Sequence, residues 1–113
     1  MQPPEYPLQV TVKDYKPTKK EEIINAVQGV WPFKHPRKGE SNNPRRRPLI
    51  FDDSEQLCRQ DRQVAETRKI VKAVWEANGE HCTVEVRCQG CILDYVFRYS
   101  ENGYYEGLIG SEP

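Results

Sequence analysis

Two alternating runs of apolar and polar residues near the C-terminus constrain the fold more than any other feature of this chain. Alternate positions are apolar at Cys82, Val84, Val86 and Cys88, and again at Cys91, Leu93, Tyr95, Phe97 and Tyr99. Because successive side chains of a β-strand point to opposite faces, a period of two is typical of strands with one buried face. The pattern predicts an antiparallel hairpin with one apolar face.

The turns of this region predict how its strands pair. Gln89-Gly90 suits a two-residue turn. Such a turn pairs Cys88 with Cys91, Val86 with Leu93, Val84 with Tyr95 and Cys82 with Phe97. A second turn at 101–103, with Gly103 in the left-handed conformation, pairs Arg98 with Glu106 and Tyr99 with Tyr105. We therefore expect a three-stranded meander over 82–109.

A long helix is expected before the meander, over 55–78. Its apolar stripe is formed by Leu57, Val64, Val71, Val74 and Trp75. Asp52, Asp53 and Ser54 offer N-cap residues with negative charge at the positive end of the helix. Asn78-Gly79 is a good stop signal.

The N-terminal half predicts two strands and a short helix. Residues 8–12 alternate apolar and polar, and 48–51 are mostly apolar, as in strands. Thr18 and Glu21 form a candidate capping box for a helix over 19–30, which Pro32 stops. The fold class is α+β: a three-to-five-stranded, mostly antiparallel sheet, with the meander 82–109 packed on the long helix and the short helix beside it. We expect a single domain over 1–113.

The positive charge of the chain is concentrated in one segment. The whole chain has 17 Lys and Arg against 17 Asp and Glu, whereas 34–48 holds six basic residues and one acidic residue. Four prolines, a glycine and two asparagines over 32–48 predict a flexible loop without regular structure. Its candidate binding residues are Lys34, His35, Arg37, Lys38, Arg45, Arg46 and Arg47.

We expect a small binding module, a protein-interaction or inhibitor-type regulatory protein, that engages its partner through this loop over 34–47. A protein partner with an acidic surface is favoured over nucleic acid. The balanced net charge argues against a strongly steered nucleic-acid binder. The alternative is nucleic acid, with the arginines on phosphates and Phe33, Trp31 or Phe51 stacking on bases. The remaining interpretations are a nuclear-import signal or a solvated loop without a specific role.

Cys88-Gln89-Gly90-Cys91 is the other feature that could carry chemistry. Two thiolates at this spacing can bind one zinc ion, for which Cys58 and His35 are the candidate further ligands. Cys82 is excluded, because six residues of strand separate it from Cys88 by about 20 Å. Two other interpretations stay open: packed apolar cysteines on the inner sheet face, and a redox pair or disulfide.

Catalytic motifs are not recognisable, and we expect a non-enzymatic protein. The sequence contains no Gly-rich phosphate loop and no H-E-x-x-H or G-x-S-x-G. The sequence shows no signal peptide, so we expect an intracellular protein, cytoplasmic or nuclear. It has no apolar run of about 20 residues, so we expect no membrane-spanning helix. An outer-face patch of Tyr104, Leu108, Val96 and Ile92 would allow a homodimer through the meander.

Overall fold

A computed structural model describes residues 5–34, 36–39, 47–52, 57–88, 95–100 and 103–108. Its strands are β1 (Glu5–Lys13), β2 (Arg37–Lys38), β3 (Leu49–Phe51), β4 (Leu57–Arg59), β5 (Thr83–Cys88), β6 (Tyr95–Ser100) and β7 (Gly103–Leu108). The helices are α1 (Lys20–Val30) and α2 (Gln63–Asn78), each preceded by a short 3-10 turn, Pro17–Lys19 and Gln60–Arg62. The predicted α+β class is confirmed.

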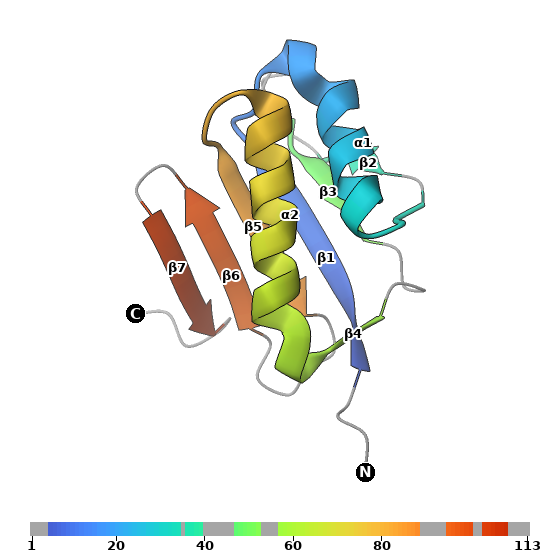
Figure 1. Cartoon of the computed structure of the whole chain (residues 1–113), viewed down its shortest axis with the longest axis vertical. Helices are drawn as coiled ribbons and strands as arrows, with labels where there is room; N and C mark the ends of the chain where they lie inside the picture. Colours follow the sequence, from blue (N-terminus) through green and yellow to red (C-terminus); the bar gives the residue numbers. More distant parts are fainter. Residues whose placement is uncertain are drawn as a thin grey trace.

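All the strand pairs are antiparallel, and they form one sheet in the order β2-β3-β1-β5-β6-β7 (Figure 1). β1 lies in the middle, with β5 along one edge and both β3 and β4 along the other. β2 has two residues and β3 and β4 have three each, so the longer strands β1, β5, β6 and β7 make the main body of the sheet.

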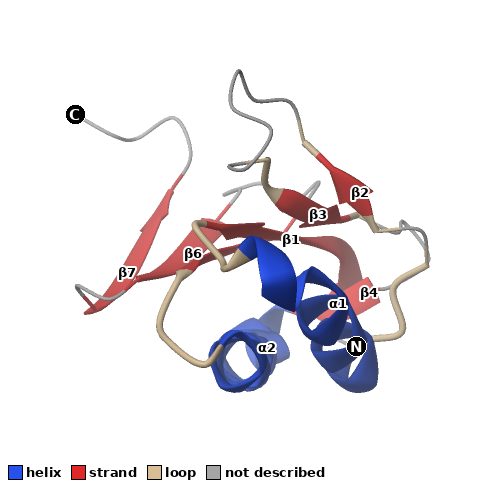
Figure 2. Cartoon of the chain, turned by 90° about the horizontal axis from the view of Figure 1, so that it is seen from above, coloured by secondary structure: helices blue, strands red, loops and turns tan. Residues whose placement is uncertain are grey.

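The two helices pack side by side on one face of this sheet (Figure 2). The alternation of β1 explains which face they cover: Leu8, Val10 and Val12 are fully buried, whereas the residues between them are partly exposed. Val84 and Val86 of β5 continue this buried layer. The helices close it with Ile23 and Val27 of α1 and Ile70, Val71 and Val74 of α2. The core thus forms between the sheet and one helical layer.

The predicted hairpin forms, but its pairing differs from the prediction. Val84 pairs with Tyr99 rather than Tyr95, and Val86 with Phe97 rather than Leu93, a shift of four residues. The predicted register, with Val84 opposite Tyr95 and Val86 opposite Leu93, is therefore wrong. The predicted pairing of Cys88 with Cys91 falls on residues 89–94, which lie outside the described residues. A period-two pattern determines the face of each residue, and an even shift leaves that face unchanged.

The second turn of the meander is also tighter than predicted. Ser100 pairs with Gly103 and Tyr99 with Tyr104, so the connection has two residues and no bulge. Tyr104 belongs to the cross-strand row of Val84 and Tyr99, while Val96 pairs with Gly107. The predicted outer-face patch, which grouped Tyr104 and Leu108 with Val96, loses its basis in this register.

The long helix begins eight residues later than predicted, at Gln63 instead of residue 55. Leu57–Arg59 forms β4 instead, pairing with Glu5–Pro7 of β1. β3 pairs with β1 only at 10–12, so the start of β1 has a free edge that β4 fills. This pairing overrides the helical pattern of the sequence. Asp52 is consequently not a helix cap, while Asp53 and Ser54 lie outside the described residues.

The structure agrees with the predicted C-terminal ends of the two helices better than with their predicted N-terminal ends. α1 stops at Val30, before Pro32, and α2 stops at Asn78 with Gly79 in the left-handed conformation at φ 82°. Thr18, the predicted N-cap of α1, lies in the preceding 3-10 turn, and α1 has no side-chain cap.

Candidate functional site

Of the basic segment 34–47, the described residues 37–39 lie at the sheet edge, where β2 pairs with β3. Arg37 pairs with Ile50 and Lys38 with Leu49, so the prediction that 32–48 has no regular structure is wrong at β2. The Gly39 N–H donates to the Pro48 carbonyl at 2.8 Å, which joins the two ends of the intervening chain. A Cβ on Gly39 would lie 2.6 Å from Cγ of Pro48, so only glycine fits this closure.

Two side-chain interactions fix this edge to the rest of the protein. The Arg37 guanidinium donates from Nε and Nη2 to one Asp52 oxygen, at 3.2 and 2.7 Å. The Tyr15 hydroxyl donates to the Arg47 carbonyl at 3.0 Å. Both ends of the segment are therefore attached to β3 or to the chain that follows β1.

The cations of the segment differ in how far they are available to a ligand. Lys38 and Arg47 are exposed, and neither forms an ion pair with any residue that the structure describes. Arg37 is exposed but engaged by Asp52. Lys34 is exposed and has a partner of its own. The other predicted members, His35, Arg45 and Arg46, lie outside the described residues.

The cysteines do not converge on one site. Cys58 lies in β4 opposite Tyr6, and Cys88 lies in β5 opposite Leu8, on the other side of β1. With strands about 4.8 Å apart, β4 and β5 are about 10 Å apart, too far for both sulfurs to lie about 2.3 Å from one zinc ion. Cys58 is therefore unsuited to complete a site with Cys88. Cys91 and His35 lie outside the described residues, so zinc at Cys88 and Cys91 stays a prediction.

Cys58 and Cys82 are buried free thiols in the core. Burial, supported by nearby carboxylates such as Glu66 for Cys58 and Asp14 for Cys82, raises the pKa of each thiol to about 11. Since the thiolate is the nucleophile, these two groups are inert at neutral pH. The packed interpretation is thus confirmed for Cys82.

We predict that iodoacetamide leaves Cys58 and Cys82 unmodified in the native protein near pH 8, because both thiols stay protonated and buried. Peptide mass mapping after a short reaction measures this directly. The same reaction in guanidinium chloride is the control, and there all four cysteines are expected to react. Native modification of Cys58 or Cys82 at the unfolded rate would contradict their placement.

A small polar cavity of about 190 Å³ lies where β4 meets the start of α2. Two of its charged groups have partners: Glu66 accepts from Trp31 Nε1 at 3.0 Å, and Arg59 binds Asp61. Two other carboxylates also form ion pairs, Asp52 with Arg37 and Glu85 with Lys13 at 3.0 Å. Within the described parts of the chain, no three His, Cys, Asp or Glu side chains group so as to hold a metal ion.

Known proteins give no further guide to this edge. Comparisons with protein-family models, curated proteins and solved structures find no match. Among the described residues, no helix has the length and apolar character needed to cross a membrane.

One surface was missed by the sequence interpretation, the flank of α2 that faces away from α1. The predicted apolar stripe treated Val64 and Trp75 as core residues. In the structure Val64 is 37% exposed and Trp75 is partly buried, and the buried side of α2 instead includes Gln63, Thr67 and Asn78. The spacing of Val64, Val71 and Trp75 was the available signal, but it does not distinguish a core stripe from a docking stripe.

Proposed function

We propose that this chain is a non-enzymatic binding module that engages an acidic surface of a protein partner through the basic segment 34–47. The observation that supports this most is the closure of the segment by the Gly39–Pro48 hydrogen bond. It holds Lys38 and Arg47 near each other on a fixed edge of the sheet. A backbone that is already ordered loses less conformational entropy on binding than a flexible loop does.

A protein partner is favoured over nucleic acid by the aromatic residues at the ends of the segment. Phe33 and Phe51 are buried, with ring centroids 5.8 Å apart. Trp31 packs against the core and is bonded to Glu66. Single-stranded nucleic acids are bound largely by stacking bases on exposed aromatic faces. These three side chains are engaged inside the protein, which favours recognition by charge alone.

We predict that replacing both Lys38 and Arg47 by alanine weakens binding of a fluorescent oligo-glutamate peptide by about tenfold at low ionic strength, since each lost charge contact is worth up to about 1 kcal/mol. Fluorescence anisotropy measures the affinity. The double variant of Lys19, which precedes α1, and Lys20, its first residue, is the control, because it removes the same charge elsewhere, and it should change affinity less than twofold. Equal loss in both variants would contradict a specific site.

A second variant tests the backbone closure of the segment separately from its charged side chains. Gly39→Ala keeps every cation but forces Pro48 away from β2, because the new Cβ would overlap the proline ring. We expect it to weaken peptide binding while the protein stays folded by circular dichroism. If single-stranded DNA at equal charge binds more tightly than the peptide, and loses affinity steeply with salt, the partner is nucleic acid and the proposal fails.

A further inference from the structure

The helical layer of this protein is narrower than its sheet. α1 and α2 lie over the part of the sheet around β3, β1 and β5, and no described helix lies over β7 (Figures 1 and 2). A helix with its side chains is about 10 Å wide, roughly two strand spacings. Among the described elements, the flank of α2 next to β6 is therefore the outer edge of the helical layer.

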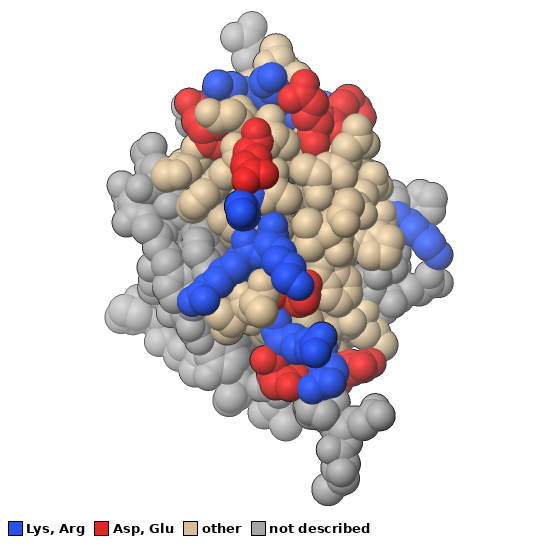
Figure 3. Space-filling view, viewed as in Figure 1, with Lys and Arg blue, Asp and Glu red and all other residues tan. Residues whose placement is uncertain are grey.

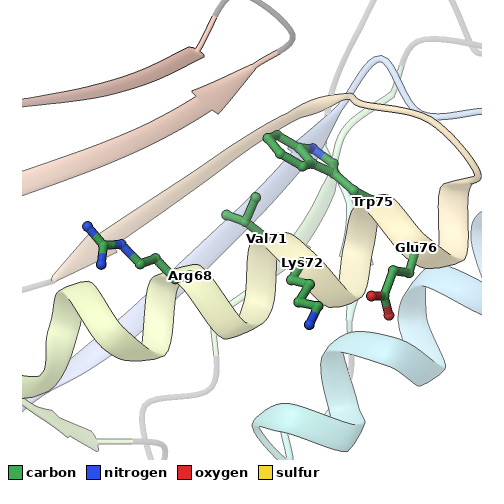
Figure 4. A pocket seen from close by; sticks show the side chains of 5 residues that line it. All are labelled: Arg68, Val71, Lys72, Trp75 and Glu76. Carbon is green, nitrogen blue, oxygen red and sulfur yellow. The ribbon is translucent and has the colours of Figure 1, made fainter.

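An apolar stripe runs along this flank. Val64, Arg68, Val71 and Trp75 follow at spacings of four, three and four residues, which places them on one side of the helix. Figure 4 shows Arg68, Val71 and Trp75 along this side, while Lys72 and Glu76 extend from the adjoining outer side of the helix, at the rim of the flank. An open cavity of about 310 Å³ is lined by Arg68, Val71, Lys72, Trp75 and Glu76. Its size suits the insertion of apolar side chains.

The rim of this α2 flank carries positive charge. Arg68 and Lys72 are exposed and form no ion pair with another described residue, whereas Lys69, farther round the helix, is bound to Glu66. Figure 3 shows Lys and Arg side chains gathered along the middle and lower part of this face. Among the described residues that line the cavity, Glu76 is the one that is acidic. The flank therefore combines apolar anchors with two cations that have no ion-pair partner among the described residues.

We propose that the α2 flank is a docking site for an amphipathic helix of a protein partner, with apolar residues against Val64, Val71 and Trp75 and acidic residues against Arg68 and Lys72. A helix at the usual interaxial distance of about 8–10 Å from α2 would lie over β6 and β7 and complete the helical layer. Helix-in-groove recognition uses the same spacing of three and four residues that the stripe presents.

A second copy of the chain fits this surface less well. A two-fold dimer brings identical patches together. The Arg68 and Lys72 side chains of the two copies would then face each other across the apolar stripe. Like charges at an interface disfavour association, whereas an acidic helix offers complementary charge.

The test uses the whole 113-residue chain and a synthetic amphipathic peptide of about four helical turns, with leucines on one face and glutamates beside them. NMR titration offers two internal reporters. The Trp75 Nε1–H, bonded to the Cys82 carbonyl at 2.7 Å, lies at the cavity, and the Trp31 Nε1–H lies at the other side of α2. We expect the Trp75 indole signal to shift on titration and the Trp31 signal to stay unchanged.

Arg68→Glu and its neighbour Lys69→Glu form the matched pair of variants, because both change the net charge by the same amount on the same helix. We expect Arg68→Glu to weaken peptide binding by about tenfold and Lys69→Glu by less than about twofold. A peptide with lysines in place of the glutamates should bind more weakly than the acidic peptide to the unmodified protein.

Several results would overturn the proposal. They are an unchanged Trp75 signal at millimolar peptide, a shift at Trp31 instead, or equal binding of the acidic and basic peptides. Concentration-dependent self-association that Arg68→Glu strengthens would assign the flank to a second copy instead. The basic segment at β2 is not involved in this test, so its outcome is independent of the proposed function.

Discussion

Phe51→Ala is expected to lower the free energy of unfolding by about 3–5 kcal/mol, the usual loss for a large aromatic residue removed from a core. Phe51 is fully buried in β3, opposite Val10 of β1, and its ring packs on Phe33. Its removal leaves a cavity between the sheet and the helices that rigid neighbours fill only in part. Urea denaturation followed by circular dichroism measures the change as a lower midpoint with an unchanged slope.

Leu57→Ala is the control for this experiment, because Leu57 is 44% exposed. Little apolar surface returns to water there, so the expected loss is below about 1 kcal/mol. Comparable losses in the two variants would mean that β3 does not border the core.

Asn78→Ala is expected to lower the free energy of unfolding by about 2–3 kcal/mol, because it leaves two backbone groups without their partner. The buried Asn78 side chain accepts from the Lys16 N–H at 2.8 Å and donates to the Glu80 carbonyl at 3.1 Å. It thus joins the end of α2 to the segment between β1 and α1. Thermal and urea unfolding measure the loss.

The same substitution at an exposed asparagine should have the opposite sign. Asn25 lies on the exposed face of α1. Alanine is the better helix former by about 0.5 kcal/mol, so Asn25→Ala should be neutral or slightly stabilising. If both variants lost equal stability, the hydrogen bonds of Asn78 would not account for its effect.

The sequence predicted the faces of the strands better than their pairing. The alternation at Val84 and Val86 correctly placed these residues in the core, because the side-chain period depends only on local geometry. The partner of Val84 depends on the length of the connection, and an even shift keeps the same face, so the pattern could not distinguish Tyr95 from Tyr99. The pattern therefore predicted the face that each residue occupies but not the register of the strand pair.

The start of α2 shows the second limit of sequence patterns. Leu57 and Cys58 continue a helical spacing, but the open edge of β1 makes them a strand. That edge exists because β3 covers only part of β1, which no local pattern reveals. Tertiary pairing overrode propensity there.

For the candidate site, the sequence identified the cations but not the backbone closure that positions them. Lys38 and Arg47 follow from composition, whereas the contact of Gly39 with Pro48 joins residues nine positions apart across a segment rich in turn formers. The α2 flank could not be recognised from the sequence for a different reason. Val71, a core residue, also lines the flank, so one apolar stripe serves both surfaces.

The most direct test of the central claim, that the basic segment 34–47 is the binding surface, is an NMR map of the unmodified protein titrated with the oligo-glutamate peptide. We predict that the backbone amides of Arg37, Lys38 and Gly39 and those of β3 shift together, while the amides of α1 stay unchanged. Shifts confined to other elements, or no shift at millimolar peptide, would contradict the account.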